Sequence, residues 1–122
     1  MNNPVGWFEI YVDDMPRAKT FYEAVFGATL EQLQAGELEM WAFPMQVNQS
    51  GASGSLVKMP GFSAGRNSVI IYFSSENCEH EEARVVAAGG KIEKPKMSIG
   101  QYGFISLVYD TEGNMIGLHS MQ

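Results

Sequence analysis

The chain has 122 residues, of which 45% are hydrophobic and 18% are charged, proportions that are typical of a globular protein. This length fits one domain with a modest core. The net charge of −6 and a pI near 4.8 disfavour nucleic acids and anionic membrane surfaces as partners, because both carry negative charge themselves.

The sequence carries no pattern of a membrane segment or a signal peptide. No apolar stretch approaches the roughly 20 residues that a membrane helix needs. Residues 1–12 lack a basic start and a long apolar run, so we expect no signal peptide. The single cysteine, Cys78, rules out an intrachain disulfide and suits a reducing compartment. We therefore expect a cytoplasmic protein with no membrane partner.

The first half of the chain predicts a strand, a helix and three further strands. Residues 7–12 alternate in polarity as a strand does. Asp13 and Asp14 then offer helix N-caps, and Pro16 suits a first helical turn. Apolar residues recur at helical spacing until Gly27, which is a typical C-terminal stop. The strands expected after this helix are near 28–33, 38–45 and 55–59, with a loop rich in Gly, Ser and Asn over 46–55.

The second half repeats this order. A strand is expected over 68–73, and Asn77 is a plausible N-cap for a helix over 78–88 that ends at Gly89. This helix places Ala83, Val86 and Ala87 on one face. The strands expected to follow are 91–94, 104–109 and 114–120, with a turn over 111–113.

The repeat predicts an α+β fold made of two βαβββ modules. The segment 27–31 resembles the segment 89–93 at an offset of 62 residues. We place module 1 at about 5–59, a linker at about 60–66 and module 2 at about 67–122, together forming a single domain. A ferredoxin-like βαββαβ fold with extra strands is the alternative, and the Gly- and Pro-containing linker makes it the weaker one.

Two stretches resemble the vicinal oxygen chelate superfamily. The run FEIYVDD at 8–14, followed by the helix that closes at Phe26-Gly27, is similar to its opening βα unit. The run DTEGNMIGLH at 110–119 is similar to its final hairpin. This superfamily includes glyoxalase I, extradiol dioxygenases, fosfomycin-resistance enzymes and bleomycin-resistance proteins. The chain most resembles small glyoxalase-related members, and since the fold hosts many chemistries, the resemblance speaks for fold more than for reaction.

The resemblance implies two curved mixed sheets around a shared cup, with the helices on the outer face. Phe8, Ile10 and Val12 are then expected to pack under the first helix, and Ile116 and Leu118 under the second. The residues of opposite parity face the cup: Trp7, Glu9, Tyr11, Ser68, Ile70, Tyr72, Met115, Gly117 and His119.

Metal-dependent members of the superfamily carry His, Gln or Glu ligands on four strands. In this sequence the resemblance puts those positions at Trp7, at Gly54 or Ser55, at Ser68 (or Asn67) and at Gly117. None of these residues is a good transition-metal ligand. We therefore predict no metal and no other cofactor, and the Lewis-acid mechanism of the metalloenzymes is not carried over.

Glu9 and His119 form a candidate catalytic pair. Each lies two residues beyond a lost ligand position, with the same cup-facing parity. A carboxylate and an imidazole in one cup can act as general base and acid or as two of three metal ligands. The structural alternative is that Glu9 bonds a neighbouring strand while His119 lines the rim.

Aromatic side chains are candidate ligand contacts. A flat-walled cup suits an aromatic or conjugated molecule. The candidates are Trp7, Trp41, Phe43, Tyr72 and Tyr102. We favour the pocket for Trp7 and Tyr72, whereas Trp41 and Phe43 equally fit a core or a dimer contact. The loops 46–54 and 98–103 are candidate lids.

Two functions follow from these residues. The first is a bleomycin-resistance-like protein that binds an apolar or aromatic small molecule without turnover. The second is a metal-independent isomerase or lyase that uses Glu9 and His119 for proton transfer. A metal-dependent lactoylglutathione lyase-type enzyme ranks last. Pairing of modules about a twofold axis also predicts a homodimer.

Overall fold

The computed structural model describes residues 5, 7–65 and 69–122. Over these residues, strands and helices alternate in the same order twice. In chain order they are β1 (Phe8–Tyr11), α1 (Met15–Phe26), β2 (Glu31–Leu33), β3 (Glu39–Ala42), β4 (Gly54–Lys58), β5 (Tyr72–Ser74), α2 (Cys78–Val85), β6 (Lys91–Ser98), the 3-10 helix η1 (Gly100–Tyr102), β7 (Phe104–Tyr109) and β8 (Met115–Ser120).

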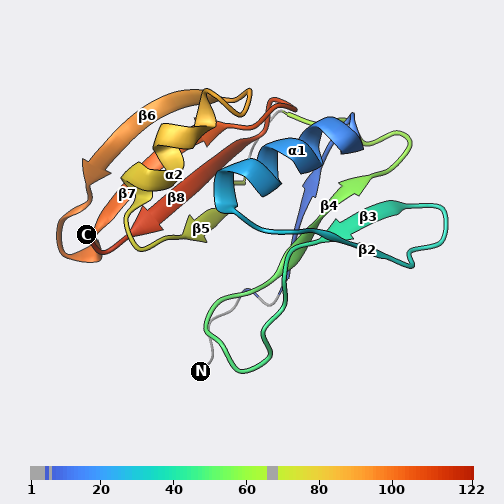
Figure 1. Cartoon of the computed structure of the whole chain (residues 1–122), viewed down its shortest axis with the longest axis horizontal. Helices are drawn as coiled ribbons and strands as arrows, with labels where there is room; N and C mark the ends of the chain where they lie inside the picture. Colours follow the sequence, from blue (N-terminus) through green and yellow to red (C-terminus); the bar gives the residue numbers. More distant parts are fainter. Residues whose placement is uncertain (1–4, 6, 66–68) are drawn as a thin grey trace.

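Each half of the chain forms its own four-stranded mixed sheet. The strand orders are β1-β4-β3-β2 and β5-β8-β7-β6, so the same topology occurs twice. In each sheet the first strand pairs parallel with the last, and the other pairings are antiparallel. Figure 1 shows the two sheets side by side. The predicted α+β fold of two βαβββ modules is therefore confirmed.

The helix α1 begins and ends at the predicted residues. The Asp14 carboxylate accepts a hydrogen bond from the Arg17 backbone N–H at 3.0 Å and so caps the first turn. Gly27 adopts the left-handed conformation with φ of 63°, which costs glycine little. The buried face consists of Met15, Ala18, Phe21, Tyr22 and Val25.

The helix α2 differs from its prediction. Asn77 caps it as expected, accepting from the Glu79 backbone N–H, but the helix ends at Val85 and its buried residues are Cys78 and Val85. The expected apolar face is wrong: Ala83 and Ala87 are exposed and Val86 is 63% exposed. In so short a helix, Cys78 and Val85 at i and i+7 already cover the contact with the core.

β2 and β3 are shorter than expected, at Glu31–Leu33 and Glu39–Ala42, and the bounds of β5 and β6 differ most. β5 starts at Tyr72, later than expected, and Ser68 lies outside the described residues. β6 continues to Ser98 instead of ending at Lys94. Its register shifts on either side of Lys94, which places Pro95 in an irregular edge strand where a missing N–H is tolerated.

An aromatic cluster joins the two modules. Phe73 of β5 contacts four rings of the first module, with centroid distances from 4.8 to 6.2 Å. These rings belong to Phe8, Tyr22, Phe26 and Phe43. One continuous core therefore lies beneath both helices, and α1 and α2 also contact each other (Figure 1).

The faces of the sheets that point away from the helices form what we call the open face. It carries Glu9, Tyr11, Tyr72, Met115, Gly117 and His119. The assignment follows from strand alternation, because Ile10, Ile116 and Leu118 belong to the buried core. No helix among the described residues is long and apolar enough to cross a bilayer.

Candidate functional site

The turn over residues 110–114 links the second module to the first. The buried Asp110 carboxylate accepts hydrogen bonds from the Tyr22 hydroxyl at 2.7 Å, from the backbone N–H groups of Glu112 and Asn114, and from Asn114 Nδ2. Burial raises the pKa of Asp110, and the hydrogen bonds from Tyr22 and Asn114 oppose that rise. Burial also raises the pKa of Tyr22 well above its usual value, so its hydroxyl stays protonated and donates.

Glu112 fixes this turn to the start of α1. Its carboxylate accepts two bonds from the Arg17 guanidinium, at 2.6 and 2.8 Å, and two from the backbone N–H groups of Asp13 and Asp14. Thr111 donates a fifth. Burial alone would raise the pKa of Glu112, but these hydrogen bonds outweigh it and lower the pKa from 4.5 to about 2. The carboxylate is thus ionised, and it ties the modules together.

Asn114 holds the loop 62–65 near the strand β1. Its Nδ2 donates to the Tyr11 carbonyl at 2.8 Å, and its Oδ1 accepts from the Gly65 backbone N–H at 2.8 Å. Asp13 Oδ1 accepts from the neighbouring Ala64 N–H at 3.1 Å. We call residues 62–65 the roof, because two side chains from different modules hold them over a pocket.

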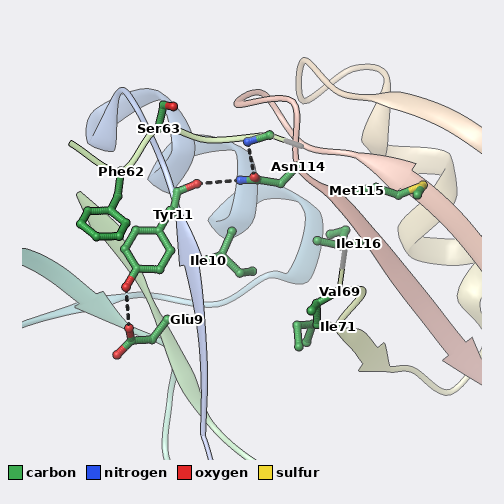
Figure 2. A pocket seen from close by; sticks show the side chains of 11 residues that line it. Glu9, Ile10, Tyr11, Phe62, Ser63, Val69, Ile71, Asn114, Met115 and Ile116 are labelled. Carbon is green, nitrogen blue, oxygen red and sulfur yellow. Dashed lines mark hydrogen bonds between the residues drawn. The ribbon is translucent and has the colours of Figure 1, made fainter. Parts of the chain in front are cut away.

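The pocket beneath the roof lies between the two modules and has a volume of about 270 Å³. We call it the central pocket (Figure 2). Its wall consists of Glu9, Ile10, Tyr11, Phe62, Ser63, Gly65, Val69, Ile71, Asn114, Met115 and Ile116. Among these described residues Glu9 is the charged one, and most of the others are apolar. Such a wall suits a small apolar molecule with one polar group.

Glu9 is oriented by its two neighbours on the open face. The Glu9 carboxylate accepts one hydrogen bond from Trp7 Nε1 at 3.3 Å and another from the Tyr11 hydroxyl at 3.2 Å. The pKa of Tyr11 is raised by burial and further by Glu9, so the phenol remains a donor. The Tyr11 ring also contacts that of Phe62, with centroids 5.9 Å apart. A carboxylate can accept about four hydrogen bonds, which leaves Glu9 acceptor capacity for a ligand.

Tyr72 lines a second pocket. We call the region between β1 and β5, where both pockets lie, the seam, and this second pocket is at its other end. This pocket has a volume of about 440 Å³, and we call it the lower pocket. It is lined by Val5, Phe8, Ser50, Gly51, Ala52, Ile70, Ile71, Tyr72, Phe73 and Ser74. The predicted lid loop over 46–54 therefore contributes a wall to this pocket.

The structure separates the remaining candidate residues. His119 is half-buried in β8, level with Ser74 of β5, and it is not among the described residues that line the central pocket. Four residues separate it from Met115 on that strand, or about 13 Å. The pair of Glu9 with His119 thus stays a prediction, with Glu9 alone in the pocket wall.

Trp41 and Phe43 lie on the helix side of their sheet. Lys19 of α1 sits over the Trp41 ring at 3.3 Å from its centroid, and Phe43 is buried against Tyr22 and Phe73. Both placements correspond to the core alternative. Tyr102 lies in η1, and its side chain falls outside what the structure describes.

At the described family positions Trp7, Gly54 and Gly117, the residues offer no good metal donor. Trp7 offers an indole N–H, and a Cβ on Gly54 would lie 2.6 Å from the Phe8 ring. At Gly117 a Cβ would overlap the Tyr72 ring, so that ring occupies the space of a ligand side chain. Ser68 and Asn67 lie outside the described residues. Within residues 5, 7–65 and 69–122, no three His, Cys, Asp or Glu side chains group closely enough to hold a metal ion.

The sequence patterns did not indicate Phe62, Val69, Ile71 or Asn114 as site residues. Phe62 falls in the segment predicted as a linker, yet an aromatic residue between Gly61 and Ser63 is a signal that a loop side chain makes a contact. Val69 and Ile71 precede the observed β5. No local pattern shows that they line the same pocket as residues of β1, because that depends on how the modules pack.

We predict that Asp13→Ala opens the roof. The change removes the acceptor of the Ala64 N–H, and the loss of one such bond shifts opening by about 1 kcal/mol, or roughly fivefold. A cysteine introduced by Met115→Cys reports the opening through its rate of labelling by iodoacetamide. The native Cys78 is fully buried and contributes little background.

Asp13→Asn is the matched control, because its amide oxygen still accepts from Ala64. It should label at the parent rate. Val47→Cys, which lies at a 96% exposed position, should label equally fast in all backgrounds. Equal labelling rates for Met115→Cys alone and for Met115→Cys combined with Asp13→Ala would show that the bond does not hold the roof.

Solved structures with the same fold include enzymes and binding proteins. Glyoxalase I from Zea mays aligns with a TM-score of 0.75 and 18% identity over 97% of this chain and 46% of that one, so this chain spans about half its length. The antibiotic-binding protein TnmS3 from Streptomyces sp. CB03234 gives 0.69 and 24%, over 97% and 95%. A glyoxylase/bleomycin resistance protein/dioxygenase domain from Frankia sp. EAN1pec gives 0.75 and 15%, over the full length of both.

At these identities the likeness establishes the fold. No curated protein matches the sequence significantly. The profile of the Glyoxalase/Bleomycin resistance protein/Dioxygenase superfamily matches residues 5–118. The chain therefore belongs to this superfamily.

Proposed function

We propose that this protein binds an apolar or aromatic small molecule in the central pocket without a metal ion. The observation that carries the proposal is the pocket itself: a mostly apolar wall at the junction of the modules, with one oriented carboxylate at Glu9. TnmS3, which has the same fold, is an antibiotic-binding protein, and this supports binding as a function that the fold performs.

Binding is tested by titrating indole, 2-naphthol and cyclohexanol in ligand-observed NMR. We expect saturation transfer to the aromatic probes in the parent and at least about tenfold weaker binding in Val69→Trp. Val69 lines the pocket and is 67% exposed, so an indole there fills the pocket without entering the core. Val47→Trp adds the same ring at an exposed loop position and should bind as the parent does. Equal affinities in both variants would contradict the central pocket as the site.

A metal-independent isomerase or lyase is the second candidate, because Glu9 is placed in the pocket wall as a general base must be. Its signature is deuterium incorporation from D2O into the acidic C–H bond of a bound ketone such as phenylacetone. Glu9→Gln and His119→Ala should each abolish the exchange if the pair acts together. Exchange that survives both changes would leave the pair without a catalytic role.

A metal-dependent lactoylglutathione lyase-type activity ranks last, because the donor set at the family positions does not fit a metal. We also propose that the chain is a cytoplasmic homodimer. The acidic composition, the single buried Cys78 and the twofold pairing available to two repeated modules support these two points.

A further inference from the structure

We propose that the ligand is an elongated molecule with a protonated amine at one end and an aromatic or apolar group at the other, bound along the whole seam between β1 and β5. This inference rests on the proposed function and adds the lower pocket as a second subsite. It specifies the ligand class through the different chemistry of the two pockets.

The two pockets are repeats of each other with the modules exchanged. The central pocket takes the later residues of β1, Glu9 to Tyr11, and residues that precede β5. The lower pocket takes the residues of β5, Tyr72 to Ser74, and the start of β1 with Val5 and Phe8. β1 and the segment 69–74, which leads into and includes β5, thus contribute residues to both pockets.

Ile71 lines both pockets, so they meet at this residue. From Ile71 to Ser74 the chain extends over about 10 Å, which is the stretch of the lower pocket that a ligand can occupy beyond this residue. Figure 2 shows Ile71 beside Val69, on the side of the central pocket opposite Glu9 and Tyr11.

Exposed apolar side chains follow the seam. Phe62 and Val69 at the central pocket are 54% and 67% exposed, and Val5 and Tyr72 at the lower pocket are 56% and 47% exposed. Apolar groups that stay in contact with water along one groove mark a surface that gains from being covered. A rod-shaped ligand covers both ends at once.

The central pocket and the lower pocket differ in charge. The Glu9 carboxylate lies at the central pocket, whereas the lower pocket is lined by apolar, serine, glycine and tyrosine residues among those described. The carboxylate forms no ion pair among the described residues, and the chain has a net charge of −6. A cationic amine therefore complements the central pocket, and a neutral ring complements the lower one.

The test is a series of phenylalkylamines of increasing length, with calorimetric or NMR titration of benzylamine, 4-phenylbutylamine and 6-phenylhexylamine. We expect affinity to rise at least about tenfold from the shortest to the longest member, as the ring reaches the lower pocket and loses its contact with water. We also expect each amine to bind several-fold more tightly than the alcohol and the carboxylate of the same length.

Two variants test the contributions of the lower pocket and of Glu9 separately. Ala52→Trp fills the lower pocket and should remove the dependence on length while keeping the preference for the amine. Val47→Trp, in the same loop, should change neither. Glu9→Gln should remove the preference for the amine and keep the dependence on length.

The outcomes are distinguishable. Binding of indole and benzylamine without any gain with length, or tighter binding of the carboxylates, overturns the elongated cation and leaves the proposed function standing. Failure of every probe in the parent overturns the proposed function as well. A length dependence that Ala52→Trp leaves intact overturns the lower pocket as the second subsite.

Discussion

Replacing Glu112 by glutamine should lower the free energy of unfolding by about 3 kcal/mol at neutral pH, the low end of the cost of breaking a buried ion pair. The side chain of Glu112 is fully buried while that of Arg17 is half exposed, so water can solvate the guanidinium after the change. The glutamine amide must also face donors from Asp13, Asp14 and Thr111. Urea denaturation at pH 7 measures the loss.

The pH dependence gives an independent value for the same contribution. The pKa of Glu112 is lowered in the folded state from 4.5 to about 2, so its stabilisation is present above pH 4.5 and is lost as the pH falls through about 2. A shift of this size corresponds to at most about 3 kcal/mol, because water at the half-exposed Arg17 screens the pair. Asp110 acts with the opposite sign, because burial raises its pKa. The difference in the free energy of unfolding between the parent and the Glu112→Gln variant, measured at each pH, isolates the contribution of Glu112, because Asp110 is present in both.

Glu37→Gln serves as the control, because Glu37 is exposed and its loss should change stability by less than about 0.5 kcal/mol. A difference between the parent and Glu112→Gln that stays constant from pH 7 to pH 2 would contradict the role of the ionised carboxylate.

Phe73→Ala should cost about 3 kcal/mol, the low end of the usual loss for truncating a phenylalanine in a core, because its ring is only partly buried. Its ring contacts four rings of the first module, including Phe26 at 4.8 Å between centroids. The change therefore removes contacts between modules and leaves a cavity beneath α1. Thermal and urea unfolding measure the loss, and a concurrent loss of probe binding would follow from the place of Phe73 in the wall of the lower pocket.

Phe62→Ala is the matched control, since the same ring is removed from a 54% exposed position. We expect a loss below about 1 kcal/mol there. Two separate unfolding transitions in Phe73→Ala would show that the modules fold independently without this ring. A single transition at the parent midpoint would show that the cluster contributes little.

Local chemistry predicted most of the fold. The bounds of α1 followed from Asp14, Pro16 and Gly27, because caps and stops act on adjacent backbone groups. Alternation placed Ile10, Ile116 and Leu118 in the core. The end of α2 was harder to predict, because the alanines and Val86 continue a helical pattern that the packing of Cys78 and Val85 does not require.

The site was less accessible to sequence reasoning because it forms between modules. Glu9 could be placed on the open face from parity alone, but its neighbours depend on how β1 meets β5 and β8. Trp41 and Phe43 were ambiguous for a similar reason: whether an aromatic strand residue faces a helix or an open cup is decided by the register of β3. The role of the roof in covering the pocket was not predicted, because a linker has no periodic pattern that indicates a contact.

The packing of Tyr72 over Gly117 couples the side chains that these two positions can carry. A ligand side chain at 117 requires the tyrosine ring to leave, and a tyrosine at 72 requires glycine at 117. A single substitution toward a metal site therefore damages the wall of the lower pocket before any metal can bind. A His or Glu introduced at 117 must therefore be combined with a smaller residue at 72, so the two positions can be exchanged only as a pair.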